Sequence, residues 1–289
     1  MSIARKILSN TLWQILGKAI VAILSVAVVK IVTNYLTIEG YGEYAIVYEF
    51  LAFFGIAADM GLFTIAVKEM SQDEKKIQKI IGNVLSLRTG LVITTVMVGV
   101  VAAFLIPKYQ GTRIPIGITI APLTTIFTIL NGTITSVLQT KLKMHIASIA
   151  QIIGKFAQVG YMLYIVLIAF PKAVGAEATD LGFYHLLVAG VIGNLVMLLI
   201  THSQVRKITP LKYEFDIKLW KEVLIKAVPF GLALILNTIY FRIDSILISL
   251  IQGQTQVGIY AVAMRVLEAF AIIPLFFMNS VLPVLTRAL

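Results

Sequence analysis

The sequence predicts an all-α polytopic membrane protein, and three observations carry this prediction: composition, recurring apolar runs and an internal repeat. Of the 289 residues, 59% are hydrophobic and 13% are charged, whereas soluble domains are about 45–50% apolar and about 25% charged. Apolar runs of about 20 residues or more, long enough to cross roughly 30 Å of hydrocarbon, recur along the chain. A membrane β-barrel would instead show alternating segments of about 10 residues, which are missing from the sequence.

Polar, turn-forming stretches separate the apolar runs and define about eight membrane-spanning helices. Arg5 and Lys6 precede the first run as in a signal peptide, but we see no convincing small-residue cleavage site after it. The first run is therefore predicted to be a retained helix. Pro122, Pro229 and Pro274 can kink the helices that contain them. The predicted spans are 12–36, 43–67, 80–106, 115–138, 146–170, 181–201, 226–250 and 257–284.

The distribution of basic loop residues predicts the orientation of the chain. One side carries 13 Lys and Arg, whereas the other carries three, namely Lys108, Arg113 and Lys172. The richer side is predicted to be cytoplasmic, so both termini are cytoplasmic. This role in topology also accounts for the net charge of +10 and argues against nucleic acid as a partner. The 13 residues are Arg5, Lys6, Lys75, Lys76, Lys79, Lys141, Lys143, Arg206, Lys207, Lys212, Lys218, Lys221 and Arg287.

An internal repeat divides the chain into lobes. The stretch "EGYGEYAIVYEFLAFF" at 39–54 matches "TQVGIYAVAMRVLEAF" at 255–270 at a constant offset of 216 residues. The two copies follow spans that both rise from the cytoplasm, so they form a parallel repeat of six helices. In such repeats the substrate path lies between the lobes. The shared residues are Gly42, Tyr44, Ala45, Leu51 and Phe54, which reappear as Gly258, Tyr260, Ala261, Leu267 and Phe270.

The repeat predicts a six-helix lobe at 1–201, a linker at 202–225 and the first two helices of an incomplete second lobe at 226–289. This count indicates a fragment of a protein with twelve or more spans; the alternative is an eight-helix protein that completes itself by dimerising. Asp216 can cap a helix in the linker whose Ile217, Trp220, Val223 and Leu224 share one face. We expect this amphipathic helix on the cytoplasmic membrane surface, with Trp220 at the interface. An ordinary lead-in to the seventh span fits equally well.

Three stretches of the sequence resemble parts of a known transporter family. "LTIEGYGEYAIVYEFLAFFGIAADMGL" resembles its first loop and second helix, with the Asp-x-Gly of Asp59 and Gly61. "PFGLALILNTIYFRIDSILISL", with Pro229 and Asp244, resembles its seventh helix, and "VGIYAVAMRVLEAFAIIP" resembles its eighth. With the matching spacing of six helices, a basic linker and two further helices, the chain resembles the polysaccharide (O-antigen, Wzx-type) flippase family of the multidrug/oligosaccharidyl-lipid/polysaccharide exporter superfamily.

This resemblance implies that the protein flips undecaprenyl-diphosphate-linked oligosaccharides across the cytoplasmic (inner) membrane by alternating access of two lobes. The partners would then be the lipid-linked oligosaccharide, membrane lipids and a coupling ion, H⁺ or Na⁺. A multidrug or cation antiporter of the same superfamily is the second reading, and a net acidic cavity would be expected for it. A membrane-embedded polysaccharide ligase or glycosyltransferase is the third; it would need a long periplasmic loop, whereas the longest loop here is cytoplasmic.

Ionisable residues inside the spans are candidate functional residues, because each costs about 2.5–3.5 kcal/mol on insertion scales. Lys18, Arg88, Lys155 and Arg242 are the candidates for holding a diphosphate or acidic sugar in a cavity. Asp59 and Asp244 are candidate coupling-ion carriers, and Asp59 can alternatively form a structural pair with Arg88 or Lys155. The full set is Lys18, Lys30, Glu49, Asp59, Arg88, Lys155, Arg242, Asp244, Arg265 and Glu268.

The repeat places Glu49 and Arg265 at equivalent positions and equal depth on opposite lobes. A Glu49–Arg265 bridge across the lobes is therefore predicted as an outer gate. The alternative is a local pair between Arg265 and Glu268, three residues apart on one helix. Arg242 and Asp244 lie two residues apart and face different ways, so they are not expected to satisfy each other. Lys30 can simply reach the outer interface.

Motifs for catalysis and cofactor binding are missing from the sequence. There is no Walker A loop, the three His residues have no metal-ligand spacing, and the chain contains no Cys. No nucleophile stands out among triad signals. The sequence therefore predicts a protein that is not an enzyme and that uses neither a cofactor nor a metal.

Overall fold

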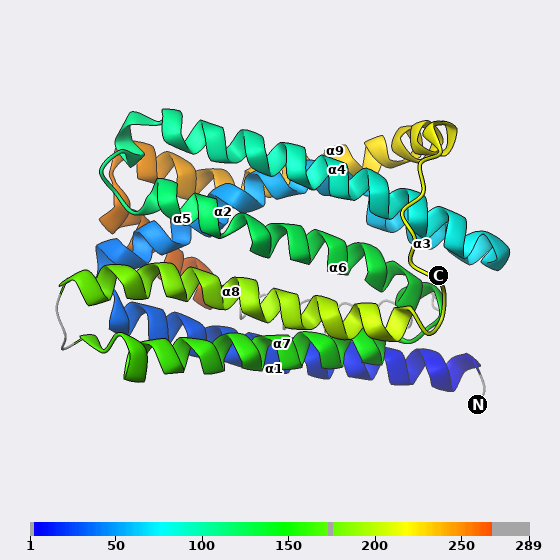
Figure 1. The fold of residues 1–289 in the computed structure, drawn as a ribbon, viewed down its shortest axis with the longest axis horizontal. Coiled ribbons are helices and arrows are strands. Elements are labelled where there is room, and N and C mark those ends of the chain that lie inside the picture. Colours follow the sequence, from blue (N-terminus) through cyan, green and yellow to red (C-terminus); the bar gives the residue numbers. More distant parts are fainter. Residues whose placement is uncertain (1–2, 173–175, 268–289) are drawn as a thin grey trace, which may run out of the picture.

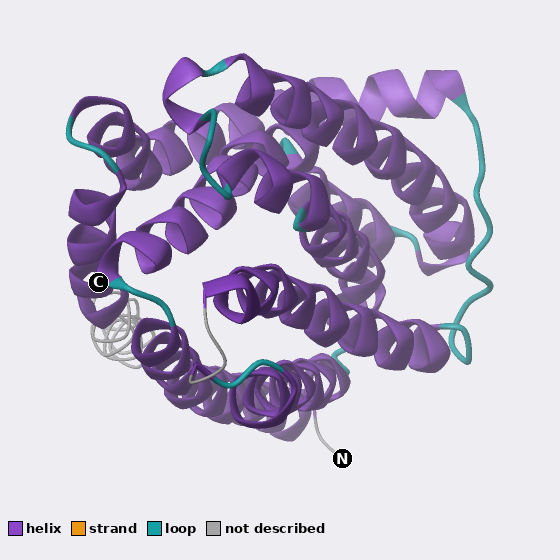
Figure 2. Ribbon diagram, turned by 60° about the vertical axis from the view of Figure 1, so that its left-hand side comes forward, coloured by secondary structure: helices purple, strands orange, loops and turns teal. Residues whose placement is uncertain are grey.

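The computed structural model describes residues 3–172 and 176–267, and regular structure within them is entirely helical. Most helices run along the long axis of the molecule, whereas the start of α9 (Ile217–Ile251), yellow in Figure 1, crosses it after the extended segment 206–216 (Figures 1 and 2). The all-α class is therefore confirmed. The helices are α1 Ile3–Tyr35, α2 Ile38–Asp59, α3 Leu62–Gln72, η1 Glu74–Lys76, α4 Ile77–Leu105, η2 Pro107–Tyr109, α5 Ile114–Ile120, α6 Pro122–Thr140, α7 Met144–Tyr164, η3 Ile165–Ala169, α8 Ala176–Val205 and α9 Ile217–Ile251. A further helix occupies 254–267.

Seven helical segments within the described residues are long and apolar enough to cross a membrane. They correspond to the first seven predicted spans, so the multi-pass class is confirmed. The eighth predicted span begins within the described helix 254–267, and its remainder, with Pro274, lies outside the described residues. The segments are Thr11–Tyr35, Ile38–Gln72, Glu74–Leu105, Ile114–Thr140, Met144–Ala169, Thr179–Val205 and Ile217–Ile251.

Two spans that the sequence predicts as continuous are broken in the middle. In span 2, α2 ends at Asp59 and α3 begins at Leu62. The helix breaks there because Met60 and Gly61 adopt positive φ values of 42° and 72°. A Cβ atom on Gly61 would lie 2.7 Å from the Cβ of Phe230, so α9 packs directly on this break. Span 4 breaks between α5 and α6 at Pro122, which begins the second helix and has no N–H to continue the first.

The bundle has two ends, which we name by their loops. The basic end contains loops 73–76, 141–143 and 206–216, and the corner end contains loops 36–37, 106–113 and 252–253. In Figure 1 the corner end is on the left and the N-terminus lies at the basic end on the right. The repeat is visible in the helix boundaries, since α2 begins at residue 38 and its counterpart begins at residue 254.

Two hydrophobic clusters fill the bundle, one toward each end, and each includes residues from both sides of the repeat. The corner-end cluster joins the first lobe to Val257 and Ala261 of helix 254–267. The basic-end cluster joins α3 and α4 to Val223 and Ala227 of α9. Helix 254–267 and α9 therefore pack on the preceding helices at the two ends of the bundle, and polar residues lie between the two clusters.

The start of α9 forms the predicted linker helix and continues into the seventh span. Asp216 caps it as expected, because its carboxylate accepts hydrogen bonds from the backbone N–H groups of Lys218 and Leu219. The helix is continuous to Ile251 and contains Pro229, so the alternative of a lead-in to the seventh span is also observed. Its first turns, yellow in Figure 1, run across the long axis of the bundle, and Trp220 and Val223 pack on the basic-end cluster. A position of these turns on the cytoplasmic membrane surface stays a prediction.

Candidate functional site

Three connected cavities lie between α1, α2, α6, α7 and α8 and the second-lobe helices. Their volumes are about 260, 210 and 380 Å³. The first and second share Lys155, Gln158 and Asn194, and the first and third share Tyr48, Thr124 and Arg265. The charged residues among the described lining residues are Lys155, Arg242, Arg265 and Asp59, so cations outnumber carboxylates.

Glu49 lies between two arginines of the second lobe. Its Oε1 accepts a hydrogen bond from Arg265 Nη2 at 2.9 Å, and its Oε2 accepts one from Arg242 Nη1. The Glu49 side chain is 10% exposed, whereas those of Arg242 and Arg265 are 30% and 36% exposed. The contact between Glu49 and Arg265 that the repeat predicted is therefore present, and Arg242 shares the same carboxylate. A role for this contact as a gate stays a prediction.

The two copies of the repeated corner touch each other directly. A Cβ atom on Gly42 would lie 1.9 Å from the backbone oxygen of Gln254, and one on Gly258 would lie 2.2 Å from the backbone oxygen of Ile38. Because Gln254 and Gly258 are the repeat equivalents of Ile38 and Gly42, the contact is reciprocal, as at a two-fold axis. Glu49 and Arg265 are also equivalent and lie roughly 10 Å deeper along the same helices. The lobes therefore meet along a pseudo-two-fold seam at the corner end.

Asp59 and Arg88 form an ion pair at the break between α2 and α3, in which Asp59 is partly exposed. Arg88 is 2% exposed, and its Nε and Nη1 atoms have no hydrogen-bond partner among the described residues. Asp59 lines the 380 Å³ cavity, whereas Arg88 lies behind it and does not line any of the three cavities. The pair with Arg88 that was the structural alternative for Asp59 is thus observed. Arg88 is buried behind Asp59 in this conformation, and its contact with substrate stays a prediction.

Lys155 lies on α7 and lines two of the cavities. It is half-buried and makes no ion pair with another described residue. Gly154 lets α7 approach α8, since a Cβ atom there would lie 2.5 Å from the backbone oxygen of Gly193. This close crossing fixes the Lys155 side chain at the cavity wall, where an ammonium group can attract an anionic ligand.

The structure separates the remaining candidates from this site. Lys18 is exposed and does not line any of the three cavities, and its neighbour Gly17 is the residue that packs on α7; its contact with substrate stays a prediction. Lys30 is exposed near the corner end of α1. Asp244 accepts a hydrogen bond from the Tyr260 hydroxyl at 3.0 Å rather than pairing with Arg242. Glu268 lies outside the described residues.

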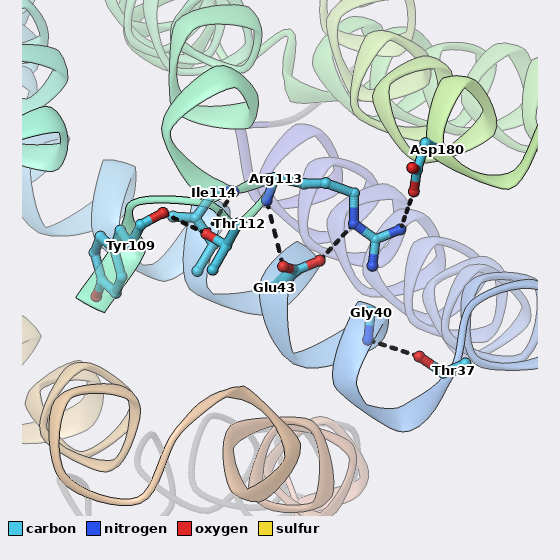
Figure 3. A network of polar contacts seen from close by, with 8 residues as sticks. All are labelled: Thr37, Gly40, Glu43, Tyr109, Thr112, Arg113, Ile114 and Asp180. Carbon is cyan, nitrogen blue, oxygen red and sulfur yellow. Dashed lines mark hydrogen bonds and ion pairs between the residues drawn. The ribbon is translucent and has the colours of Figure 1, made fainter. Parts of the chain in front are cut away.

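A second polar network, which the sequence did not indicate, braces the corner end (Figure 3). Arg113 Nε donates to Glu43 Oε2 at 2.6 Å and Arg113 Nη1 donates to Asp180 Oδ1 at 3.1 Å. The guanidinium also lies 4.6 Å from the ring centroid of Phe183. Glu43 is buried on the second turn of α2, directly after Gly42. The network therefore holds the first-lobe half of the seam in place.

Two contacts across the lobes close the corner end beside the seam. Tyr109 and Ser249 share a buried hydrogen bond of 2.9 Å between their hydroxyls, and Lys108 Nζ donates to the backbone oxygen of Ile251 at 3.4 Å. Burial raises the pKa of Tyr109 above its ordinary value, so its hydroxyl stays protonated at neutral pH. The sequence placed Tyr109 and Lys108 in a loop and gave no signal for either contact.

Comparison with protein families identifies the class. A family model described as "Polysaccharide biosynthesis protein" matches residues 7–289, and the chain belongs to this family. The family lies within the superfamily named above for the resemblance, which is thereby confirmed. The search of curated proteins found no match.

Two solved structures share the fold. One, titled "protein A", superposes with a TM-score of 0.69 at 15% identity. The other, whose title names the MATE multidrug transporter DinF-BH in a ligand complex, superposes with a TM-score of 0.64 at 14% identity. The alignments cover 98% of this chain and 65% of each matched chain. At these identities the similarity concerns the fold alone, and the chain spans less than two thirds of both structures.

Proposed function

We propose that this protein is a membrane transporter that flips a diphosphate-linked oligosaccharide lipid by alternating access between two lobes. The observation that carries the proposal is the cationic lining of the inter-lobe cavity. Lys155, Arg242 and Arg265 line the cavities, and Asp59, which is paired with Arg88, is the one carboxylate of the described lining. Glu49 behind the lining is shared by the two arginines, so one carboxylate balances two guanidinium groups and Lys155 adds a further positive charge. A diphosphate is anionic, and guanidinium groups match its oxygens bidentately.

The corner-end contacts support alternating access as the mechanism. The seam at Gly42 and Gly258, the hydroxyl pair of Tyr109 and Ser249, and the Glu49 cluster all lie on the corner-end side or at mid-depth. A conformation closed at this end suits loading from the opposite side. We therefore propose that the basic end faces the cytoplasm of an inner membrane, in agreement with the positive-inside rule.

The test is a flipping assay with the reconstituted protein and a fluorescent undecaprenyl-diphosphate oligosaccharide, read by quenching of the outer leaflet. Lys155→Gln removes a cavity cation that has no ion pair with a described residue, so transport should fall at least about tenfold while membrane insertion is unchanged. Lys76→Gln, at the exposed basic end, is the matched control and should transport normally. Normal transport by Lys155→Gln would remove the basis of the proposal.

A drug or cation antiporter is the second candidate, because one structure with the same fold is titled as a multidrug transporter. A cationic cargo favours a net acidic cavity, whereas the described lining is net basic. Uptake of a fluorescent lipophilic cation by the same proteoliposomes separates the two. Cation transport that Lys155→Gln leaves intact or increases, without flipping of the lipid-linked oligosaccharide, would favour the antiporter.

A further inference from the structure

The polar face of α7 continues beyond the inter-lobe cavity into a pocket within the first lobe. Gln151, Lys155 and Gln158 are spaced at i, i+4 and i+7, which places them on one side of the helix. The helix lies in a segment apolar enough to cross a membrane, where polar side chains are costly unless they meet polar partners. All three side chains line the 210 Å³ pocket, so the stripe faces a polar interior.

The chemistry of this pocket is neutral apart from Lys155. Its other polar lining residues are Gln151, Gln158, Asn194 and Thr128, and no carboxylate is present in the described lining. The Thr128 hydroxyl lies 2.9 Å from Asn194 Oδ1 and 2.8 Å from the Thr124 backbone oxygen, so its one proton is shared between them, and Asn194 Nδ2 donates to the Gly190 backbone oxygen at 2.9 Å. The two contacts of Asn194 orient its amide and leave one of its N–H groups for a ligand.

The two glutamines have hydrogen-bonding capacity that the fold does not use. The side chains of Gln151 and Gln158 form no hydrogen bond with another described residue. Each amide offers two N–H donors and a carbonyl acceptor. Alternating donors and acceptors on neighbouring amides match the vicinal hydroxyl or acetamido groups of a sugar ring. Such groups also suit a neutral ligand better than an ion, which would need charged partners.

We propose that this pocket is a glycan subsite that binds the sugar attached directly to the diphosphate of the cargo. The inference rests on the proposed function. Lys155, Gln158 and Asn194 belong both to this pocket and to the 260 Å³ cavity that Arg265 lines. A phosphate held near Lys155 therefore puts the next group of the cargo beside the amides. The pocket is smaller than the about 300–1,000 Å³ of drug-sized sites, so it fits one ring rather than a chain.

The experiment compares two probes that differ by one sugar. Undecaprenyl diphosphate and undecaprenyl diphosphate bearing a single N-acetylhexosamine are titrated against the purified protein in nanodiscs. The wild type should bind the sugar-bearing lipid about tenfold more tightly, which one or two hydrogen bonds can supply. Gln158→Leu and Gln151→Leu should remove this preference without weakening the bare lipid, whereas Lys155→Gln should weaken both probes. Gln78→Leu, an exposed glutamine of α4, is the control and should keep the preference.

The outcomes separate the subsite from the wider proposal. Equal affinity of the wild type for the two lipids overturns the subsite and leaves the flippase proposal standing. Equal weakening of both probes by Gln158→Leu also overturns it, because the residue would then act on the fold or on the phosphate. Binding of neither lipid overturns both proposals. Gln151 is exposed, so Gln151→Leu carries the test if Gln158→Leu does not fold.

Discussion

At the scale of single residues, two carboxylates inside the bundle organise the cations around them. Glu49 holds Arg242 and Arg265, and Asp59 holds Arg88. The depth of a residue in the membrane can be estimated from its position along a helix. The repeat placed Arg265 at the depth of Glu49 and so indicated it as a partner. Arg242 was not foreseen as a second partner, because its contact joins residues 193 positions apart and depends on how α9 packs.

Removing the Glu49 charge should open the corner end. In Glu49→Gln the two arginines lose their shared carboxylate and repel each other, so closure becomes unfavourable. We expect at least about a tenfold loss of flipping in proteoliposomes. The exchange Glu49→Arg with Arg265→Glu should restore only part of the loss, because it places an arginine beside Arg242. Full activity of Glu49→Gln would exclude this cluster as a gate.

The Asp59–Arg88 pair should contribute to stability. Asp59→Asn leaves the nearly fully buried Arg88 without a charged partner, which should lower the free energy of unfolding by about 3–5 kcal/mol. Adding Arg88→Met should recover much of this loss, since the buried charge is then removed. Denaturation in detergent measures both. Glu69→Gln breaks the exposed pair with Lys226 and should cost less than about 1 kcal/mol. If Asp59 served only to bind a coupling ion, Asp59→Asn would unfold with the same free energy as the wild type.

At the scale of helices, the ends and breaks decide where the lobes meet. The sequence predicted seven spans correctly because an apolar run of sufficient length is a local property. The break at Met60 and Gly61 was missed, because a single Gly in an apolar run does not reveal the positive φ that packing against α9 imposes. The packing of the start of α9 was not predicted for a related reason, since Val223 and Trp220 contact a distant part of the chain.

The cap of α9 predicts a pH dependence at the basic end. A hydrogen bond from Lys79, with those from Leu219 and Lys218, lowers the pKa of Asp216. A lowered folded-state pKa means that the carboxylate stabilises the fold above its unfolded pKa of about 3.9 and that this is lost as the pH falls below it. In a Trp13→Phe background, the fluorescence of Trp220 should report fraying of α9 in that range.

Asp216→Ala should produce the same Trp220 signal at neutral pH. Asp73→Ala is the matched control, because Asp73 caps a turn of three residues, η1, and its pKa is lowered chiefly by Lys76. It should leave the Trp220 spectrum unchanged. Equal spectra for Asp216→Ala and the wild type would mean that packing on the basic-end cluster, rather than the cap, fixes the start of α9.

The corner-end seam requires glycine for close approach. A Cβ atom on Gly42 would overlap the backbone oxygen of Gln254, and backbone cannot move aside as a flexible side chain can. Gly42→Ala should therefore prevent full closure and reduce flipping at least about tenfold. Gly90→Ala is the control, since a Cβ atom there meets no other group within 4 Å. Wild-type transport by Gly42→Ala would show that the seam does not need to close.

At the scale of the whole molecule, the two copies of the repeat contact each other through equivalent residues. The sequence predicted this symmetry from five identities, and the reciprocal contacts of Gly42 and Gly258 agree with it. It could not predict the Arg113 network or the Tyr109–Ser249 bond, because loop residues show no periodicity that assigns partners. The amide pocket was detectable in principle: three polar residues at i, i+4 and i+7 on α7 stand out in an apolar helix.

If alternating access requires the corner end to open, tethering the lobes there should stop transport. Lys108 and Ile251 contact each other across the lobes, and the chain contains no Cys. Cysteines at 108 and 251, joined by a short reducible thiol crosslinker, should abolish flipping, and reduction should restore it. The control pair, Glu74→Cys with Lys141→Cys, joins groups 2.7 Å apart within the first lobe and should transport when crosslinked. Transport by the tethered 108–251 protein at the wild-type rate would contradict a moving corner end.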